Sequence, residues 1–121
     1  MATTAVTQAE FGPTITQNGI VFVDFWAAWC GPCRMFGPVF EAVSEAHPDA
    51  VFAKVDTDAE RELAGGLGIT SIPTLMAFRD GYLVYREAGA LNKSQFERLV
   101  QQVEELDMEK LKAEAEAAKS A

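Results

Sequence analysis

The sequence predicts an α/β domain in which helices cover both faces of a central β-sheet. Three observations support this fold class. Strand-like and helix-like segments alternate, residues 20–26 have the β-branched and aromatic composition of a strand buried on both faces, and a Gly-containing turn near residue 80 joins two further strands. The resulting order, β-α-β-α-β-α-β-β-α, fits a sheet between two helical layers.

The N-terminal segments predict a short edge strand near residues 3–6 and a first helix. Thr7-Gln8-Ala9-Glu10 has the form of a capping box, which places the helix start near Gln8. Pro13 would remove one hydrogen bond and press on the carbonyl of Ala9. We therefore expect a kinked or two-piece helix that ends near residues 18–19.

The next segments predict a right-handed β-α-β crossover. A strand at residues 20–26 leads into a helix that starts at the cysteines and runs to about Ala46, with a kink expected at Pro38. A strand at residues 50–56 completes the unit. Core positions in the first strand and helix are Phe22, Phe25, Trp26, Val39 and Phe40.

The C-terminal half predicts a short helix, a hairpin and a last helix. Thr57-Asp58-Ala59-Glu60 has the form of a second capping box, and Gly65-Gly66 should end the helix that follows. Strands at residues 74–78 and 82–87 flank the turn at 79–81. Asn92 with Gln95 can cap the last helix, which has one apolar face. That face comprises Phe96, Leu99, Val100, Val103 and Leu106.

The chain ends in an acidic, alanine-rich tail. Residues 104–121 contain six acidic residues and three lysines, and pairs such as Lys112 with Glu116 support a helix that continues into solvent. We divide the chain into a domain at residues 1–106 and a helical tail at 107–121. A solvated extension is favoured over a partner-binding role.

Length and charge limit the classes of function. The chain has 121 residues, 49% of them hydrophobic, and a net charge of −8, which suits one domain and disfavours nucleic acid and anionic membranes as partners. No Lys or Arg precedes Arg34, so a basic signal region is missing, and the apolar run at residues 20–29 is too short to span a bilayer. We expect a soluble, cytoplasmic monomer.

The two cysteines of the chain, Cys30 and Cys33, fall where the second helix should begin, and Pro32 suits a first helical turn. Residues three apart on a helix lie about 5 to 6 Å apart, inside the Cα window of about 4.4 to 6.8 Å that a disulfide tolerates. The helix N-terminus favours a thiolate, the nucleophile of disulfide exchange. We assign the attack to Cys30, nearer the exposed end, and resolution to Cys33, one turn further in.

Zinc binding is the main alternative for two cysteines at this spacing. Zinc needs about four ligands, and only His47 could add a usual nitrogen donor. We therefore expect catalytic thiols and no metal site.

Residues 23–34, Val-Asp-Phe-Trp-Ala-Ala-Trp-Cys-Gly-Pro-Cys-Arg, closely resemble the active-site segment of the thioredoxin family. The resemblance covers about residues 2–106. It implies the thioredoxin fold, a central five-stranded mixed sheet flanked by four helices, here with a C-terminal helical extension. It also implies a thiol-disulfide oxidoreductase that reduces protein disulfides through a reversible Cys30–Cys33 pair. No cofactor would be bound, and the partners would be disulfide-containing proteins and a flavoprotein thioredoxin reductase that supplies electrons from NADPH.

The resemblance also assigns roles outside the cysteine pair. Asp24 is a carboxylate in a core strand, so a raised pKa or a partner is expected, and it matches the family aspartate that assists proton transfer at Cys33. Lys54 matches the lysine that approaches this aspartate. Pro73 matches the cis-proline loop that lies against the dithiol. The ordinary alternatives are a structural ion pair, a solvated lysine and a simple turn proline.

A flat, weakly polar surface around Cys30 would bind extended substrates. Its residues, by the same resemblance, are Trp29, Gly31, Pro32, Ile72, Pro73, Gly89 and Ala90. Alternatively, Gly89 only relieves a strand end and Trp29 is an ordinary surface aromatic. Two other functions remain open. They are a disulfide isomerase or oxidase on the same fold, and a non-catalytic binding module.

Overall fold

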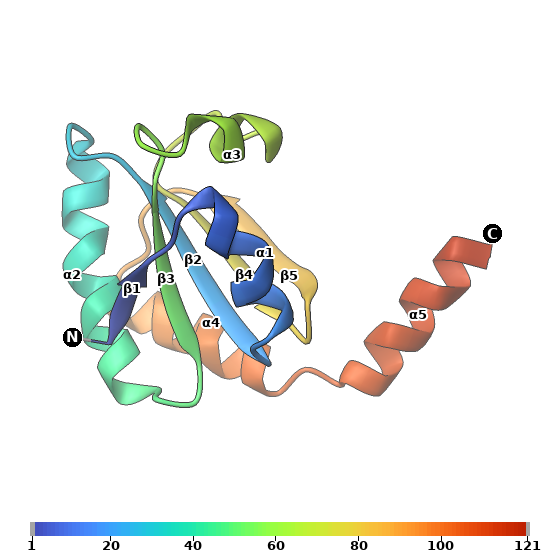
Figure 1. The fold of residues 1–121 in the computed structure, drawn as a ribbon. Coiled ribbons are helices and arrows are strands. Elements are labelled where there is room, and N and C mark those ends of the chain that lie inside the picture. The colour runs from blue at the N-terminus through green and yellow to red at the C-terminus, as the bar shows by residue number, and fades with distance from the viewer. Residues whose placement is uncertain (1, 121) are drawn as a thin grey trace.

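A five-stranded mixed sheet forms the centre of the computed structural model, which describes residues 2–120 (Figure 1). The elements are β1 (Thr3–Ala5), α1 (Gln8–Thr16), β2 (Ile20–Trp26), α2 (Gly31–Ala46), β3 (Val51–Asp56), α3 (Arg61–Gly66), β4 (Thr74–Arg79), β5 (Tyr82–Ala88), α4 (Lys93–Glu104) and α5 (Met108–Ser120). The strand order is β1-β3-β2-β4-β5. The first three strands are parallel, and β4 and β5 are antiparallel to their neighbours, so the predicted fold class is confirmed.

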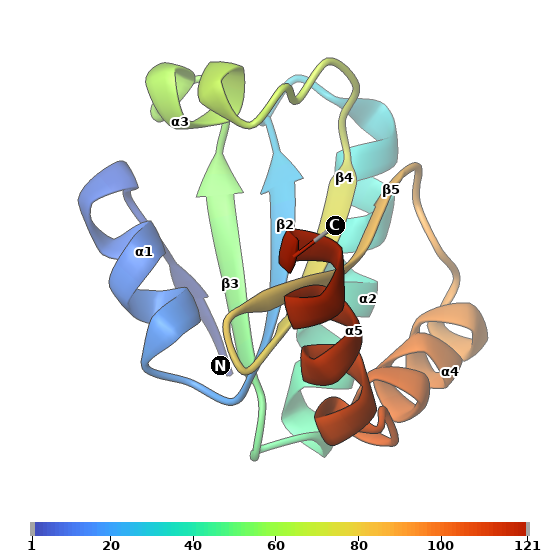
Figure 2. The same ribbon diagram turned by 90° about the vertical axis from the view of Figure 1, so that its right-hand side faces the viewer.

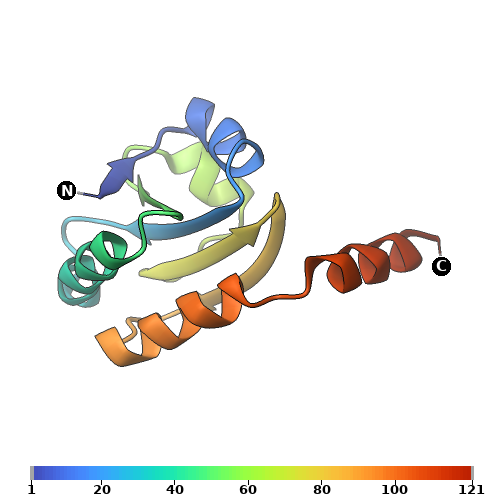
Figure 3. The same cartoon turned by 90° about the horizontal axis from the view of Figure 1, so that it is seen from below.

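Two helical layers cover the sheet, with α1 and α3 on one face and α2 and α4 on the other (Figures 2 and 3). Alternation along β2 divides its side chains between these faces. Phe22 packs among residues of α2 and α4, whereas Val23 and Phe25 pack in the cluster that includes α1. Asp24 has the parity of Phe22 and therefore lies on the α2 face.

The first helix begins where the capping box predicts, because the Thr7 backbone N–H donates to Glu10 Oε1 at 3.0 Å. It is one continuous helix through Pro13 and ends at Thr16, so the expected end near residues 18–19 is wrong. The side-chain amide of Asn18 donates to the Thr14 carbonyl at 2.8 Å. That bond replaces the backbone bond that would have continued the helix.

The second predicted capping box, unlike the first, does not form, since Thr57 does not cap α3. Its backbone N–H and its hydroxyl both donate to the Trp26 carbonyl, at 2.9 and 3.1 Å, and join the ends of β3 and β2. The helix starts at Arg61. It ends at Gly66, as expected from the Gly65-Gly66 pair, and Gly68, with φ of 68°, then reverses the chain. The N–H of Ile69 donates to the Ala64 carbonyl at 2.9 Å, the bond of a Schellman motif.

The C-terminal extension is helical, but it is a separate helix rather than a continuation of α4. The α4 helix ends at Glu104, and Asp107 then caps α5 by accepting the Lys110 N–H at 3.1 Å. Lys112 Nζ lies 3.1 Å from Asp80 Oδ2 in the hairpin turn, beyond which α5 points away from the sheet (Figures 1 and 3). The division at residues 106 and 107 stays a prediction.

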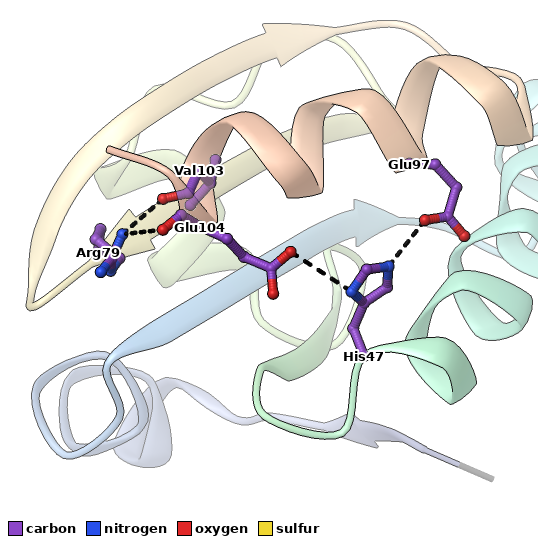
Figure 4. Close-up of polar contacts among 5 residues, drawn as sticks. All are labelled: His47, Arg79, Glu97, Val103 and Glu104. Atoms are coloured by element: carbon purple, nitrogen blue, oxygen red, sulfur yellow. Dashed lines mark hydrogen bonds and ion pairs between the residues drawn. The ribbon is translucent and has the colours of Figure 1, made fainter. Parts of the chain in front are cut away.

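Away from the cysteines, polar contacts join the C-terminal end of α2 to α4 and the C-terminal end of α4 to β4. His47, the C-cap of α2, has Nε2 2.8 Å from Glu97 Oε2 and Nδ1 3.6 Å from Glu104 Oε1 (Figure 4). Arg79 donates to the Val103 carbonyl at 2.7 Å and thereby caps α4. None of the helices within residues 2–120 has the length and apolarity needed to cross a membrane.

Candidate active site

The two cysteines lie at the N-terminus of α2, directly beyond the end of β2. Cys30 is the N-cap, with φ of −87° and ψ of 115°, and Cys33 lies in the first turn. Pro32 occupies that turn, where a missing N–H costs nothing. The two sulfurs are joined in a disulfide, and the Cα atoms are 5.2 Å apart. The predicted placement of the pair is therefore confirmed.

Cys30 Sγ lies in a polar backbone environment. It accepts the backbone N–H of Cys33 at 3.2 Å, and it lies 3.7 Å from the carbonyl oxygen of Ile72. In the reduced protein, the same N–H and the positive end of the helix dipole stabilise a thiolate at Cys30.

Residue exposure does not distinguish the two cysteines in the oxidised protein. Cys30 is 5% exposed and Cys33 is 4% exposed, so the expectation that Cys30 is clearly the more accessible does not hold for this state. Their neighbours differ instead. Cys30 faces the loop that contains Ile72, whereas Cys33 lines a groove of about 350 Å³. The groove is lined by Trp26, Ala27, Cys33, Arg34, Gly37, Pro38, Glu41 and Lys54.

Asp24 is fully buried beneath α2, and within residues 2–120 neither of its carboxylate oxygens has a hydrogen-bond partner. Burial raises the pKa of this carboxyl from 3.8 to about 7, and the positive charge of Lys54 opposes that rise. The two residues are register partners across the parallel β2–β3 pair. A carboxyl with this pKa can take up and release a proton near neutral pH.

Lys54 reaches the groove that Cys33 lines. Its ammonium lies 5.0 Å from the centroid of the Trp26 ring, within the range of a cation–π contact. A Cβ added at Gly37, one helical turn after Cys33, would be 3.7 Å from Lys54 Nζ. Trp26 is half-buried and lines this groove, so its assignment to the core is only partly correct.

The loop before β4 lies against the dithiol. The Ile72–Pro73 peptide bond is cis, as expected, and Ile72 packs against the cluster of Ala27, Cys30 and Cys33. Gly89 donates its N–H to the Pro73 carbonyl at 2.8 Å, and its φ of 112° is one that favours glycine. Gly89 therefore joins the end of β5 to this loop. Ala90 is exposed directly after it, and no hydrogen bond among residues 2–120 ties Ala90 to the cysteines.

Trp29 is 68% exposed beside Cys30, and its indole N–H donates to Asp58 Oδ2 at 2.9 Å. Gly31 is half-buried and Pro32 is exposed on the same turn. Sequence reasoning missed Asp58, which it used only as part of a capping box. The available signal was topological. Parallel strands β2 and β3 end at the same edge of the sheet, so a polar residue just after β3 lies near the cysteines.

The structure separates His47, the extra ligand considered for zinc, from the two cysteines. His47 is the C-cap of the helix that has the cysteines at its N-terminus, so it cannot join them as a ligand. The described residues contain no group of three or more His, Cys, Asp or Glu side chains placed to hold a metal ion.

Comparisons with known proteins agree with the site. The thioredoxin family model matches residues 2–104. A thioredoxin from Alicyclobacillus acidocaldarius is 47% identical over 97 residues, covering 79% of this chain and 92% of the relative. Thioredoxin 1 from Synechococcus elongatus is 47% identical over 92 residues, covering 74% of this chain and 86% of the relative.

Solved structures give the same result for the fold. A thioredoxin from Plasmodium falciparum superposes with a TM-score of 0.75 at 39% identity, over 83% of this chain and 97% of that one. The paired cysteines at the start of α2 make the protein a thiol-disulfide oxidoreductase, and the chain belongs to the thioredoxin family.

Proposed function

We propose that the protein reduces disulfides of other proteins by a two-step exchange in which Cys30 attacks and Cys33 resolves. The Cys30 thiolate attacks one sulfur of the substrate disulfide, forms a mixed disulfide and releases the other substrate thiolate. The Cys33 thiolate then attacks Cys30 Sγ, forms the Cys30–Cys33 disulfide and releases the second substrate thiolate. Two electrons pass to the substrate. The observation that carries this assignment is the Cys33 N–H donated to Cys30 Sγ at the helix N-terminus.

In this proposal Asp24 accepts the proton that Cys33 must lose before it attacks. The support is a buried carboxyl with a pKa raised by burial to about 7, beneath the helix that carries Cys33. Lys54, across the strand pair, offsets part of the cost of the Asp24 charge and faces the groove along which water can reach Cys33.

The substrate would lie on the surface around Cys30. We propose as its contact residues Trp29, Gly31, Pro32, Ile72, Pro73, Gly89 and Ala90. Support comes from the exposure of Trp29 and from the contacts that hold Ile72 and Gly89 beside the dithiol. Backbone groups and weakly polar side chains dominate this surface, which suits many extended polypeptides.

The oxidised pair must be reduced again for a second turnover. We propose a thioredoxin reductase, a flavoprotein that takes electrons from NADPH, as the donor, and a monomeric protein acting in the cytoplasm. In this scheme the protein is an electron carrier between that reductase and its disulfide substrates, and its own redox group is the Cys30–Cys33 disulfide.

The reduction potential of the pair tests the direction of the proposed reaction. The protein is equilibrated with a defined thiol–disulfide buffer and its free thiols are counted by alkylation. We expect about −270 mV, the value typical of thioredoxins. A potential of about −180 to −120 mV would instead indicate an isomerase or an oxidase, and a pair with no reversible oxidation would indicate a binding module.

Asp58 is expected to position Trp29 for substrate binding. Replacing Asp58 with Asn keeps the shape but weakens the acceptor of the indole N–H, so the Trp29 ring is less well fixed. We expect KM for a protein disulfide to rise by about two- to fivefold while kcat changes little, as fits a lost hydrogen bond of about 1 kcal/mol. Asp49→Asn, an exposed position in the α2–β3 connection, is the control. A fall in kcat at constant KM would contradict this role.

A further inference from the structure

A second, polar cavity of about 240 Å³ lies beside the proposed substrate surface. It is lined by Gly68, Thr70, Ser71, Thr74, Arg86, Glu87 and Ala88. Three of its segments continue directly into that surface: Ser71 precedes Ile72, Thr74 follows Pro73, and Ala88 precedes Gly89. In Figure 2 the chain passes from α3 over the top of the sheet into β4, with β5 beside it. A polypeptide bound at Cys30 could therefore extend a side chain into the cavity.

Arg86 supplies the positive charge of this cavity. One guanidinium nitrogen donates to the Gly68 carbonyl at 3.0 Å, which holds the side chain against the loop. Arginine has five N–H donors, and no other acceptor for Arg86 is found within residues 2–120. The guanidinium is thus anchored at one nitrogen and open at the others.

Glu87 is the one acidic residue in the lining. The strand register places its side chain on the opposite face of β5 from that of Arg86. Arg86 pairs with Met76, which packs in the cluster with α1, and Glu87 pairs with Leu75, which packs in the cluster with α2 and α4. Directly paired residues of antiparallel strands share a face. Burial and, to a smaller extent, the Glu87 carboxylate raise the pKa of Tyr85, which agrees with a Glu87 side chain near Tyr85.

Hydroxyl groups complete the donor set. Thr70 and Ser71 are exposed, and their hydroxyls make no hydrogen bond with any other described residue. The Thr74 hydroxyl is already used, since it donates to the Ser71 carbonyl. A guanidinium with open donors beside two free hydroxyls matches a carboxylate, which accepts up to about four hydrogen bonds.

We propose that this cavity is a specificity subsite, in which Arg86 pairs with an acidic side chain of the substrate polypeptide close to its disulfide. The inference rests on the proposed reduction of protein disulfides and names which of them are preferred. The net charge of −8 repels acidic substrates at long range, so a gain at the subsite depends on the position of the acid and not on the total charge of the substrate.

A set of short peptides with one disulfide tests the subsite. Each peptide carries Asp at one of three positions on either side of a cysteine, and a matched peptide carries Asn there. For the unmodified protein we expect kcat/KM to favour Asp over Asn by about three- to tenfold at one position, mainly through a lower KM and less so at high salt. The Asp/Asn ratio cancels any difference in the amount of folded protein.

Two variants separate the subsite from bulk charge. Arg86→Gln should bring the Asp/Asn ratio to about one, and Arg86→Lys should retain part of it, because a lysine keeps the charge but loses the planar donor pair. Arg98→Gln, which removes the same charge from an exposed position on α4, should keep the full ratio.

Three results would overturn the subsite. They are a ratio near one at every position in the unmodified protein, a ratio that survives Arg86→Gln, and a ratio that Arg98→Gln lowers equally. In each case reduction of the Asn peptides would leave the proposed function standing. A protein that reduces none of the peptides would fail the proposed function itself.

Discussion

Replacing Cys33 with Ser will leave the protein covalently joined to its substrates through Cys30. The first exchange needs only the Cys30 thiolate, whereas release of the substrate needs a second thiolate within reach of Cys30 Sγ. The chain has only two cysteines, so in Cys33→Ser no other thiol of the protein can replace Cys33. We expect turnover to fall by at least about a hundredfold and mixed disulfides to accumulate. Non-reducing electrophoresis and intact-mass measurement detect them.

Cys30→Ser is the matched control for this experiment. Because the two cysteines are equally buried in the oxidised protein, their exposure cannot assign the attack. The assignment depends on the N–H donated to Cys30 Sγ and on the Ile72 loop that faces it. Cys30→Ser should form almost no trapped complex. If it traps substrates as well as Cys33→Ser does, the roles of the two cysteines are wrong.

Replacing Asp24 with Asn will remove most of a pH dependence of stability. In the unfolded chain the carboxyl ionises near pH 3.8, whereas in the folded protein burial raises its pKa to about 7. Between these values the folded state holds a proton that the unfolded state has lost, so the free energy of unfolding falls as pH rises from about 4 to 7 and levels off above. The difference of about three pKa units corresponds to a loss on the order of 4 kcal/mol.

Chemical denaturation at pH 4 and pH 8 measures this effect. Relative to the unmodified protein, Asp24→Asn should gain a few kcal/mol of unfolding free energy between pH 4 and pH 8, because only the unmodified protein loses stability over that range. Asp49→Asn makes the same chemical change at an exposed position and should alter neither value by more than about 0.5 kcal/mol. If Asp24→Asn changes the unfolding free energy equally at both pH values, folding does not raise the pKa of Asp24.

The same Asp24→Asn variant tests proton transfer. In rapid-mixing experiments we expect the first attack by Cys30 to keep its rate, while resolution by Cys33 slows by about ten- to a hundredfold near neutral pH. Unchanged resolution would limit Asp24 to a structural and electrostatic role.

Much of the fold follows from local sequence patterns. The boundaries of β2 and α2 agree with the pattern because a doubly buried strand, a Pro in the first turn and the cysteine spacing all favour the same break. The Asn92–Gln95 cap is also confirmed, since each side chain bonds to the backbone N–H of the other residue. The prediction failed where a side chain expected to bond to its own segment bonds instead to a segment distant in the sequence.

Thr57 shows how such a failure arises. Its hydroxyl can bond either to the backbone three residues later or to the end of the neighbouring strand, and only the register of β2 and β3 decides between them. The Trp29–Asp58 bond and the Arg86–Gly68 contact likewise join segments that are adjacent only once the sheet has formed. The sequence indicates the chemical type of these residues but not their partners.

The tail illustrates a limit of helix periodicity. Residues 104–121 have helical composition throughout, yet Asp107 interrupts the run because its side chain caps the next turn. The pairing of Lys112 with Asp80 depends on the hairpin and could not be inferred from spacing along one helix.

The close approach of Cys30 and Cys33 also bears on how the protein withstands peroxide. Oxidation of the Cys30 thiolate by hydrogen peroxide gives a sulfenic acid and hydroxide, and further oxidation to sulfinic acid is irreversible in most proteins. With a second thiol one helical turn away, the sulfenic acid instead condenses with Cys33 to give the disulfide already seen here and a molecule of water. The damage becomes the ordinary oxidised state, which the electron donor can reverse.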